Sequence, residues 1–303
     1  MSNTIQGLWI GSELSNIELL SINSFIKNGH VYHLYCYDKI KNIPDGVIVK
    51  DGNEILDKSE IFTYKNGSYS AFSNLFRFTL LYKQGGYWAD TDLICVKSLK
   101  DFDQEDVVII SEPDQSYLKD IPTSCFIKLP KNSEIAKRAI EIQYEHKKLI
   151  LDGSMEWSSG PKTVGQLVNE FNLNVKSWKT VCTCAWNHWI SLLDSNVTIN
   201  KDVTKKIENI PVETYCIHLW HEGLRKFFIQ YQMTKNSRFK VGCLFEELKK
   251  KYLDNYDSVH TEESNKDIKV LQNNISSYKS KLDTYSHNNT KSQKLSDSVV
   301  LTF

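Results

Sequence analysis

Two carboxylates separated by one residue, Asp90 and Asp92, lie between two short apolar runs, residues 87–89 and 93–96. Such runs are typical of buried strands, so the carboxylates are expected at a kink within an extended segment. Two carboxylates this close repel each other unless a cation lies beside them. Carboxylate oxygens suit Mg²⁺ or Mn²⁺, which enter sites of this kind together with a diphosphate. The spacing therefore predicts a site for a divalent cation and a diphosphate.

A helix that must position these carboxylates is predicted immediately before them, from Ser70 to the Gly85-Gly86 pair. Its apolar stripe is formed by Phe72, Leu75, Phe76, Thr79 and Leu80. Its polar side chains, which share the opposite face, are Ser70, Ser73, Asn74 and Arg77. Ser70 is expected to cap the helix start, and the glycines are expected to end it because glycine tolerates the left-handed backbone. The polar face and the two carboxylates then come close together.

The whole stretch resembles the DxD-containing glycosyltransferases of the GT-A type. The resemblance is to the sugar-binding-region family, which includes bacterial capsule and lipopolysaccharide transferases, α-1,4-galactosyltransferases and initiating α-1,6-mannosyltransferases. The family pattern, Ser-Asp-x-x-Arg, a helix and Gly-Gly-x-Tyr/Trp-x-Asp-x-Asp, matches residues 72–77 and 85–92. Asn74 departs from the pattern because the family usually has Asp at this position. The Gly-Gly, the aromatic pair and Asp-Thr-Asp together are a far stronger signal than a bare Asp-x-Asp.

This resemblance implies an α/β fold with a Rossmann-like core, in which a mostly parallel sheet is flanked by helices. It also implies metal-dependent transfer of a hexose from a UDP-sugar, of galactose, N-acetylgalactosamine or glucose type, with retention of configuration. The implied acceptor is an oligosaccharide or glycolipid in capsule, lipopolysaccharide or other cell-surface polysaccharide synthesis. The alternatives are a transferase that acts on a protein and a non-catalytic module that binds a nucleotide sugar.

The resemblance assigns catalytic roles to Asp90, Asp92 and Arg77. Asp92 is the expected metal ligand, and Asp90 holds the ribose or a metal-bound water, or is a second ligand. The expected donor-binding residues are Trp9, Gly11, Tyr37, Ser70, Ser73, Asn74, Arg77, Asp90, Thr91 and Lys226. The expected sugar or acceptor pocket comprises Trp88, Gly160, Pro161, Lys162, Trp186 and His188.

A late strand is predicted from the alternation of residues 213–221, and it contains His218. The transferases that this chain resembles often bring a histidine from a C-terminal strand back to the cation, which implies that His218 is a ligand and His221 the second choice. Imidazole suits Mn²⁺ better than Mg²⁺, so Mn²⁺ is the expected cofactor and Mg²⁺ the alternative. A strand histidine bonded to backbone is the other interpretation of His218.

Several of these assignments have a plain structural alternative. Trp9 and Tyr37 end the first two predicted strands, where α/β sheets bind ligands, but they are also interpreted as core aromatics. The Gly160-Pro161-Lys162 turn is interpreted either as a pocket wall or as an ordinary helix start. Trp186 and His188 form either a sugar platform or part of the packed core.

Composition excludes some classes of protein. The chain has 303 residues with 37 Lys+Arg and 37 Asp+Glu, so a basic nucleic-acid binder is not indicated. Its seven cysteines are scattered, and Cys182 and Cys184 complete no zinc template along the sequence, so we expect buried free thiols in a reducing cytosol. Neither a secretory signal nor a membrane span is visible, which predicts a cytoplasmic protein, soluble or peripheral at the inner face of the membrane.

Residues 1–253 are predicted to form the catalytic domain and residues 254–303 a polar, partly helical extension. The domain opens with a β-α-β unit whose helix is capped by Ser15 or Asn16, which implies a parallel strand pair. Later helices are predicted after Ser133, with Ile135, Ala139, Ile142 and Leu149 inward, and after Asn236-Ser237, with Val241, Leu244, Phe245, Leu248 and Tyr252 inward. A short heptad pattern over residues 268–285 predicts docking on the catalytic domain, pairing with a second protomer or contact with a membrane-bound partner.

Overall fold

The computed structural model describes residues 4–114, 117–182, 184–186, 188–193, 206–221, 225, 234–239, 242–254 and 256. The predicted boundary at residue 253 and the heptad segment 268–285 therefore stay predictions, since nearly all of the proposed extension lies outside the described residues.

A seven-stranded sheet with the order β3-β2-β1-β4-β7-β6-β8 forms the centre of the molecule. Its strands are β1 (Thr4–Trp9), β2 (Val31–Cys36), β3 (Val47–Asp51), β4 (Gly86–Ala89), β6 (Val108–Pro113), β7 (Asp120–Leu129) and β8 (Val175–Lys176). β7 runs antiparallel to both β4 and β6, whereas the other neighbouring pairs are parallel. A second, two-stranded antiparallel sheet joins β5 (Leu93–Cys95) to β9 (Cys216–His218). The predicted α/β class and mostly parallel sheet are confirmed.

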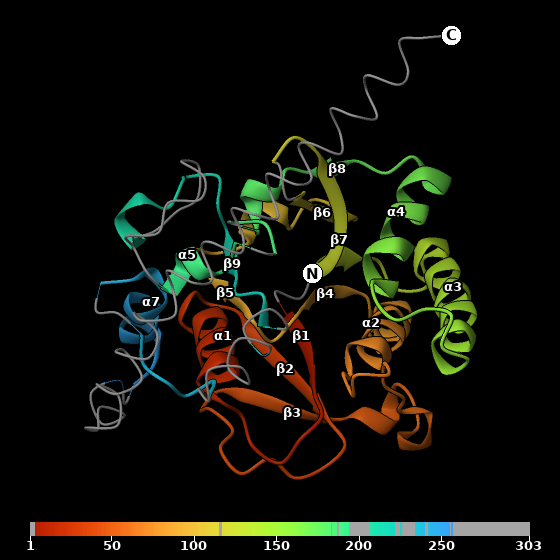
Figure 1. Cartoon of the computed structure of the whole chain (residues 1–303), viewed down its shortest axis with the longest axis horizontal. Helices are drawn as coiled ribbons and strands as arrows, with labels where there is room; N and C mark the ends of the chain where they lie inside the picture. Colours follow the sequence, from red (N-terminus) through yellow and green to blue (C-terminus); the bar gives the residue numbers. More distant parts are fainter. Residues whose placement is uncertain are drawn as a thin grey trace, which may run out of the picture.

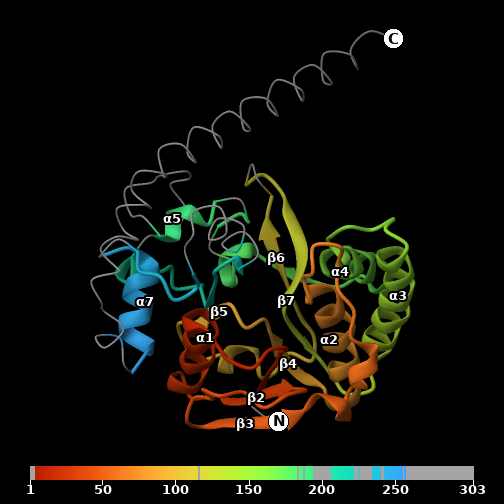
Figure 2. The ribbon, with the colours of Figure 1, turned by 60° about the horizontal axis from the view of Figure 1, so that its bottom comes forward.

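Helices cover both faces of the central sheet (Figures 1 and 2). One side carries α1 (Asn16–Lys27) and α7 (Leu244–Tyr252), with the short α5 (Ile190–Leu193) nearby. The other side carries α2 (Ser70–Gln84), α3 (Glu134–Leu151) and α4 (Ser159–Phe171). Successive residues of a strand pack against opposite helix layers: Phe126 packs on the α1 side and Ile127 on the α2 side.

The predicted β-α-β opening is confirmed, because β1 and β2 pair in parallel on either side of α1. Ser15 caps α1 through a capping box: its hydroxyl accepts from the helix backbone, and Glu18 accepts from the Ser15 backbone N–H at 2.7 Å. Because β1 and β2 run in the same direction, their carboxyl ends lie side by side at one edge of the sheet.

The organising helix α2 agrees with the prediction in its apolar stripe and in its end. All five predicted stripe residues are buried, and Gly85 ends the helix with φ +68°. A side chain at Gly85 would place its Cβ 2.6 Å from the Lys131 backbone nitrogen. The predicted Ser70 cap is wrong: Tyr69 holds the cap position without a side-chain hydrogen bond, and the Ser70 hydroxyl lies 3.0 Å from that of Ser68.

Two other helix predictions need correction. In α3 the buried residues include Ala136, Ala139, Ile142 and Ile150, whereas Leu149 is 40% exposed. The last helix starts at Leu244 after its cap residue Cys243, and not at Asn236-Ser237, because Gly242 adopts a left-handed backbone with φ +79° just before it. Leu244, Phe245, Leu248 and Tyr252 are buried as expected, and Val241 lies outside the described residues.

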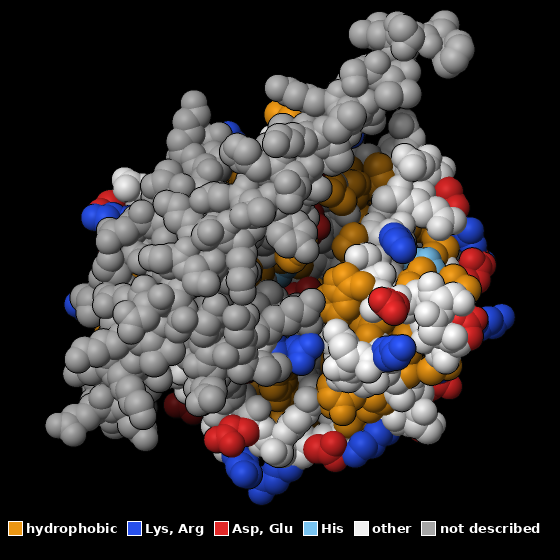
Figure 3. All heavy atoms as spheres, in the orientation of Figure 1, with side chains coloured by type: hydrophobic (Ala, Val, Ile, Leu, Met, Phe, Trp, Pro, Cys, Tyr) orange, Lys and Arg blue, Asp and Glu red, His pale blue; other side chains and the backbone are white. Residues whose placement is uncertain are grey.

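The part of the surface that the structure describes mixes charges of both signs. Lys, Arg, Asp and Glu side chains alternate with apolar ones over the α2–α4 side in Figure 3, in keeping with 37 basic and 37 acidic residues in the chain. Among the described helices none combines the length and the apolar character that crossing a membrane requires.

The capping box makes a stability prediction. Ser15→Ala removes one of the two reciprocal cap bonds, so we expect the free energy of unfolding to fall by about 1 kcal/mol. Urea denaturation followed by circular dichroism measures it. The nearby exposed Ser12→Ala is the control and should change the value by less than about 0.5 kcal/mol. Equal values for the two variants would contradict the cap assignment.

Candidate active site

The turn between β4 and β5 carries Asp90, Thr91 and Asp92 at the edge where the parallel strands end. The Asp90 backbone N–H donates to the Cys125 carbonyl of β7 at 2.8 Å, and the Leu93 N–H donates back to the Asp90 carbonyl at 3.1 Å. Asp90 and Asp92 therefore sit on a tight, backbone-bonded kink between two buried strands.

Asp90 is held by groups from α2 and β4. Arg77 NH2 lies 2.6 Å from its Oδ1, and Trp88 Nε1 donates to the same oxygen at 2.7 Å. The Arg77 guanidinium also lies 4.9 Å from the Trp88 ring centroid and donates to Asn74 Oδ1 at 2.5 Å. Burial raises the pKa of Asp90, Arg77 opposes that rise, and the neighbouring Asp92 adds to it. The polar face of α2 is thus a buried support for Asp90.

Asp92 is held from the opposite side, by β9 and the residues after it. His218 Nε2 lies 3.4 Å from Asp92 Oδ2, and the His221 backbone N–H donates to the same oxygen at 2.8 Å. The Leu219 N–H donates to the Asp92 carbonyl at 3.0 Å, and Trp220 turns the chain with a left-handed φ of +55°. Burial alone would raise the pKa of Asp92, but His218 and His221 hold it below its ordinary value. The pKa of His218, which burial would lower, is raised well above its usual range by Asp92.

The donor set fits a hard or borderline divalent cation. One ligand atom each from Asp90, Asp92 and His218 lies within 4.8 Å of the other two. Two carboxylate oxygens and an imidazole nitrogen are ligands that Mn²⁺ accepts, and a cation between the carboxylates would relieve their mutual repulsion. The predicted metal residues are therefore brought together from two segments far apart in the sequence.

The start of α4 forms the wall behind Asn74. Ser159 Oγ accepts from Asn74 Nδ2 at 2.9 Å and from the Tyr64 hydroxyl at 2.6 Å. A Cβ on Gly160 would lie 2.4 Å from Ser124 Oγ and 2.6 Å from Asn74 Oδ1, so only glycine fits there. The predicted Gly160 turn thus touches the site through Asn74. Pro161 is half-buried and Lys162 exposed in the same first turn.

Three of the residues predicted for the donor or the sugar are placed differently. Trp88 is 1% exposed, so its ring offers no face to a sugar, and it acts on Asp90 instead. The Arg77 side chain is only 3% exposed, which makes it a support for Asp90 and not a direct donor contact. His188 is buried, with Nδ1 2.9 Å from the Tyr117 hydroxyl, and burial lowers its pKa to about 4.

The remaining predicted residues divide between surface and core. Trp186 is 48% exposed and so shares no platform with the buried His188. Ser70, Ser73 and Thr91 are half-buried. Tyr37 packs on Phe72 and Phe76 and donates to the Leu56 carbonyl at 2.9 Å, which favours its core interpretation. Lys226 lies outside the described residues.

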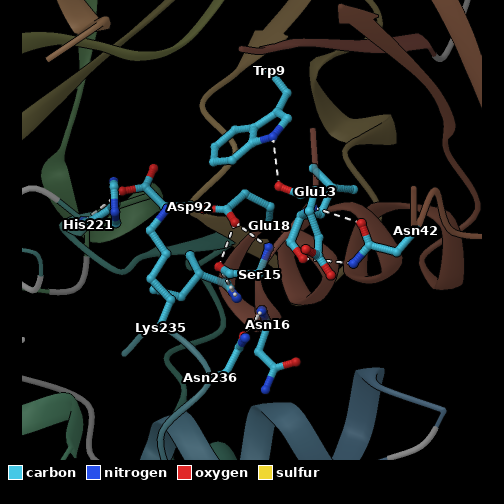
Figure 4. A network of polar contacts seen from close by, with 12 residues as sticks. Trp9, Glu13, Ser15, Asn16, Glu18, Asn42, Asp92, His221, Lys235 and Asn236 are labelled. Carbon is cyan, nitrogen blue, oxygen red and sulfur yellow. Dashed lines mark hydrogen bonds and ion pairs between the residues drawn. The ribbon is translucent and has the colours of Figure 1, made fainter. Parts of the chain in front are cut away.

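At the end of β1, Trp9 keeps a partly exposed ring. Its Nε1 donates to the Glu13 carbonyl at 3.0 Å, and exposed Gly11 follows. Lys235 Nζ lies 4.9 Å from the Trp9 ring centroid and 2.6 Å from Glu18 Oε1. Figure 4 shows Trp9, Lys235, Asp92 and His221 in one close view. The sequence alone does not point to Lys235, because its one local signal, a lysine beside a predicted helix start, is common on surfaces.

Comparison with known proteins adds a family match over part of the chain. Residues 18–113, which include the Asp90–Asp92 turn, match the family described as "Glycosyltransferase sugar-binding region containing DXD motif". Proteins of this family usually bind a divalent metal. None of the curated proteins compared with the chain matches it.

The chain is also similar to three solved structures that are described as glycosyltransferases. The apo-form glycosyltransferase GlyE of Streptococcus pneumoniae TIGR4 has 12% identity and a TM-score of 0.50, covering 91% of this chain and 64% of that one. A second GlyE structure has 12% identity and a TM-score of 0.48, covering 86% and 63%. The PaToxG glycosyltransferase has 16% identity and a TM-score of 0.41, covering 56% of this chain and 70% of that one.

This chain spans slightly less than two thirds of the GlyE chains. At this level of identity the likeness to GlyE concerns the fold, while the motif match concerns the site. The two agree: residues 18–113 match a DXD-containing sugar-binding region, and the fold of the chain is similar to that of the glycosyltransferase GlyE.

Proposed function

We propose that the protein transfers a hexose from a UDP-sugar to a glycan acceptor, in a reaction that depends on a divalent cation. The preferred cation is Mn²⁺. The observation that carries this proposal is the convergence of Asp90, Asp92 and His218 at the exit edge of the sheet. Mn²⁺ is favoured over Mg²⁺ because one of the three donors is an imidazole.

Asp92 and His218 would hold the cation, with Asp90 as a further ligand or as the partner of the ribose. When bound, the cation acts as a Lewis acid that neutralises the charge developing on the departing diphosphate. Arg77 and Trp88 fix Asp90 Oδ1, so its second carboxylate oxygen is the one that faces the ligand. The His221 N–H fixes Asp92 Oδ2 in the same way. His218 Nε2, 3.4 Å from that oxygen, is the nitrogen that would hold the cation. The chain therefore holds both carboxylates in place before the donor arrives.

The nucleotide is proposed to lie over the carboxyl ends of β1 and β2, as ligands do in sheets of this kind. Trp9 offers a partly exposed aromatic ring there for the base, and Lys235 a cation near it for the diphosphate. Lys235 is only about a quarter exposed, since its side chain is 23% accessible and paired with buried Glu18. That pairing holds the ammonium at the rim of the site.

The finer parts of the proposal rest on resemblance. They are retention of the anomeric configuration, a galactose, N-acetylgalactosamine or glucose donor, an oligosaccharide or glycolipid acceptor, and a role in capsule or lipopolysaccharide synthesis at the cytoplasmic face of the membrane. The alternative that stays open is a protein acceptor at the same donor site.

A donor panel tests the proposal directly. The full chain is incubated with UDP-, GDP- and other nucleotide sugars, with Mn²⁺, with Mg²⁺ or with EDTA, and nucleotide release is measured. We expect release of UDP from at least one UDP-hexose with Mn²⁺, less with Mg²⁺ and none with EDTA. Release only from a GDP-sugar would contradict the UDP assignment, and undiminished release in EDTA would contradict the metal dependence.

Asp92→Asn tests the proposed ligand. The amide keeps the size of the side chain but loses the charge, so turnover with Mn²⁺ should fall by more than about a hundredfold. Glu134→Gln, an exposed carboxylate at the start of α3, is the matched control and should keep full turnover. Normal turnover of a folded Asp92→Asn variant would contradict the assignment of Asp92 as a metal ligand.

Gly160→Ala tests the wall behind Asn74. The new Cβ would lie within 2.6 Å of Asn74 Oδ1 and must displace it, and Arg77 with it, so turnover should fall by about tenfold or more. Gly165→Ala, in the same helix with no atom within 4 Å of the new Cβ, is the control. It should keep its turnover and gain up to about 1 kcal/mol of stability. Equal turnover in both variants would show that Asn74 does not need its present position.

A further inference from the structure

Two cysteines and a histidine meet in the core directly behind the Asp90–Asp92 turn. Cys125 comes from the middle of β7, Cys182 from the segment after the 3₁₀ turn Trp178–Thr180, and His218 from β9. One ligand atom from each lies within 4.8 Å of the other two. Cys125 is 2% exposed, Cys182 0% and His218 6%. The sequence offers no zinc spacing here, because the three residues come from separate segments.

The distances are close to those of a tetrahedral zinc site. Cys125 Sγ and Cys182 Sγ lie 3.9 Å apart, and Cys182 Sγ lies 3.9 Å from His218 Nδ1. With metal bonds of about 2.3 Å to sulfur and about 2.05 Å to nitrogen, tetrahedral angles require about 3.8 Å between sulfurs and about 3.6 Å from sulfur to nitrogen. Two of the three ligand separations therefore lie within about 0.3 Å of the tetrahedral values, and the third, between Cys125 and His218, is within 4.8 Å.

We propose that Cys125, Cys182 and His218 form a second cation site, selective for thiophilic divalent ions such as Zn²⁺ and Cd²⁺. Thiolates select these ions over Mn²⁺ and Mg²⁺, which prefer the carboxylates a few ångströms away. Binding takes one proton from each thiol and releases both to solvent. Three protein ligands leave the fourth position to a water molecule.

The chemistry of the thiols is consistent with this site. Burial would raise the pKa of Cys125, but Cys182 and His218 together hold it below its usual value. Burial and Cys125 raise the pKa of Cys182.

The two cation sites share one imidazole. His218 directs Nδ1 at Cys182 and Nε2 at Asp92, 3.4 Å from Oδ2. A neutral imidazole has one nitrogen with a free lone pair, so a soft ion on Nδ1 leaves the proton on Nε2. Nε2 then donates to Asp92 and has no lone pair for Mn²⁺. A soft cation therefore inhibits the proposed activity by removing its nitrogen ligand; this consequence, unlike the site itself, rests on the proposed function.

Cadmium binding tests the site without any measurement of activity. The reduced full chain is titrated with Cd²⁺, and the ultraviolet sulfur-to-cadmium charge-transfer absorption is recorded. We expect saturation near one equivalent, and loss of that absorption in Cys125→Ser and in Cys182→Ser. Cys182→Ala and a thermal unfolding curve for each variant separate loss of the ligand from loss of the fold.

Another buried cysteine pair supplies the matched control. Cys95 and Cys216 lie opposite each other in the β5–β9 register and are both 0% exposed. Cys95→Ser and Cys216→Ser should keep the saturating absorption. Absence of the absorption from the wild-type chain, or its survival in folded Cys125→Ser and Cys182→Ser, would overturn the site.

Competition tests the shared imidazole. Saturating Mn²⁺ should raise the apparent Kd for Cd²⁺ at the charge-transfer band by about tenfold, because two ligands that need the same nitrogen are coupled. An unchanged Cd²⁺ titration in the presence of Mn²⁺ would overturn the sharing. Failure of the proposed transferase activity would leave the charge-transfer result standing, so the two proposals fail separately.

Discussion

The repulsion between Asp90 and Asp92 is the constraint on which the rest of the site depends. Two carboxylates on one tight turn are stable there because each has its own partners: Arg77 and Trp88 for Asp90, His218 and the His221 N–H for Asp92. These partners come from opposite sides of the sheet, α2 and β4 on one hand and β9 on the other. The fold thus supports the two charges separately and leaves the space between them to the proposed cation.

The pairing of the strands places these partners. β7 enters antiparallel beside β4, so its Cys125 carbonyl can accept the Asp90 N–H, and β5 leaves the main sheet to pair with β9. The register Leu93↔His218 then fixes how far the imidazole stands from Asp92. A shift of one residue in this pairing would turn His218 to the other face, so the small sheet sets the geometry of the proposed metal site.

Local sequence patterns predict the part of the site within residues 70–92, and the resemblance to a family predicts His218. The helical period, the Gly-Gly pair and the Asp-Thr-Asp spacing all lie within residues 70–92, so α2, β4 and the turn follow from neighbouring residues. His218 was inferred from the family alone, since nothing in its neighbourhood fixes the β5–β9 register. The Asn74–Ser159–Tyr64 contacts, the Glu18–Lys235 pair and the Cys125–Cys182–His218 cluster join segments that periodicity cannot relate. Where local rules failed, at the Ser70 cap, Leu149 and the start of α7, tertiary packing or a left-handed glycine decided.

In the proposed site, one divalent ion is held jointly by the turn after β4 and by β9. Its most direct measurement is a crystal of the full chain soaked with Mn²⁺ and UDP, with anomalous scattering recorded at the manganese absorption edge. We expect one strong peak in contact with Asp92, His218 Nε2 and the diphosphate of UDP. A peak that avoids both residues, or bound UDP without any peak, would contradict it.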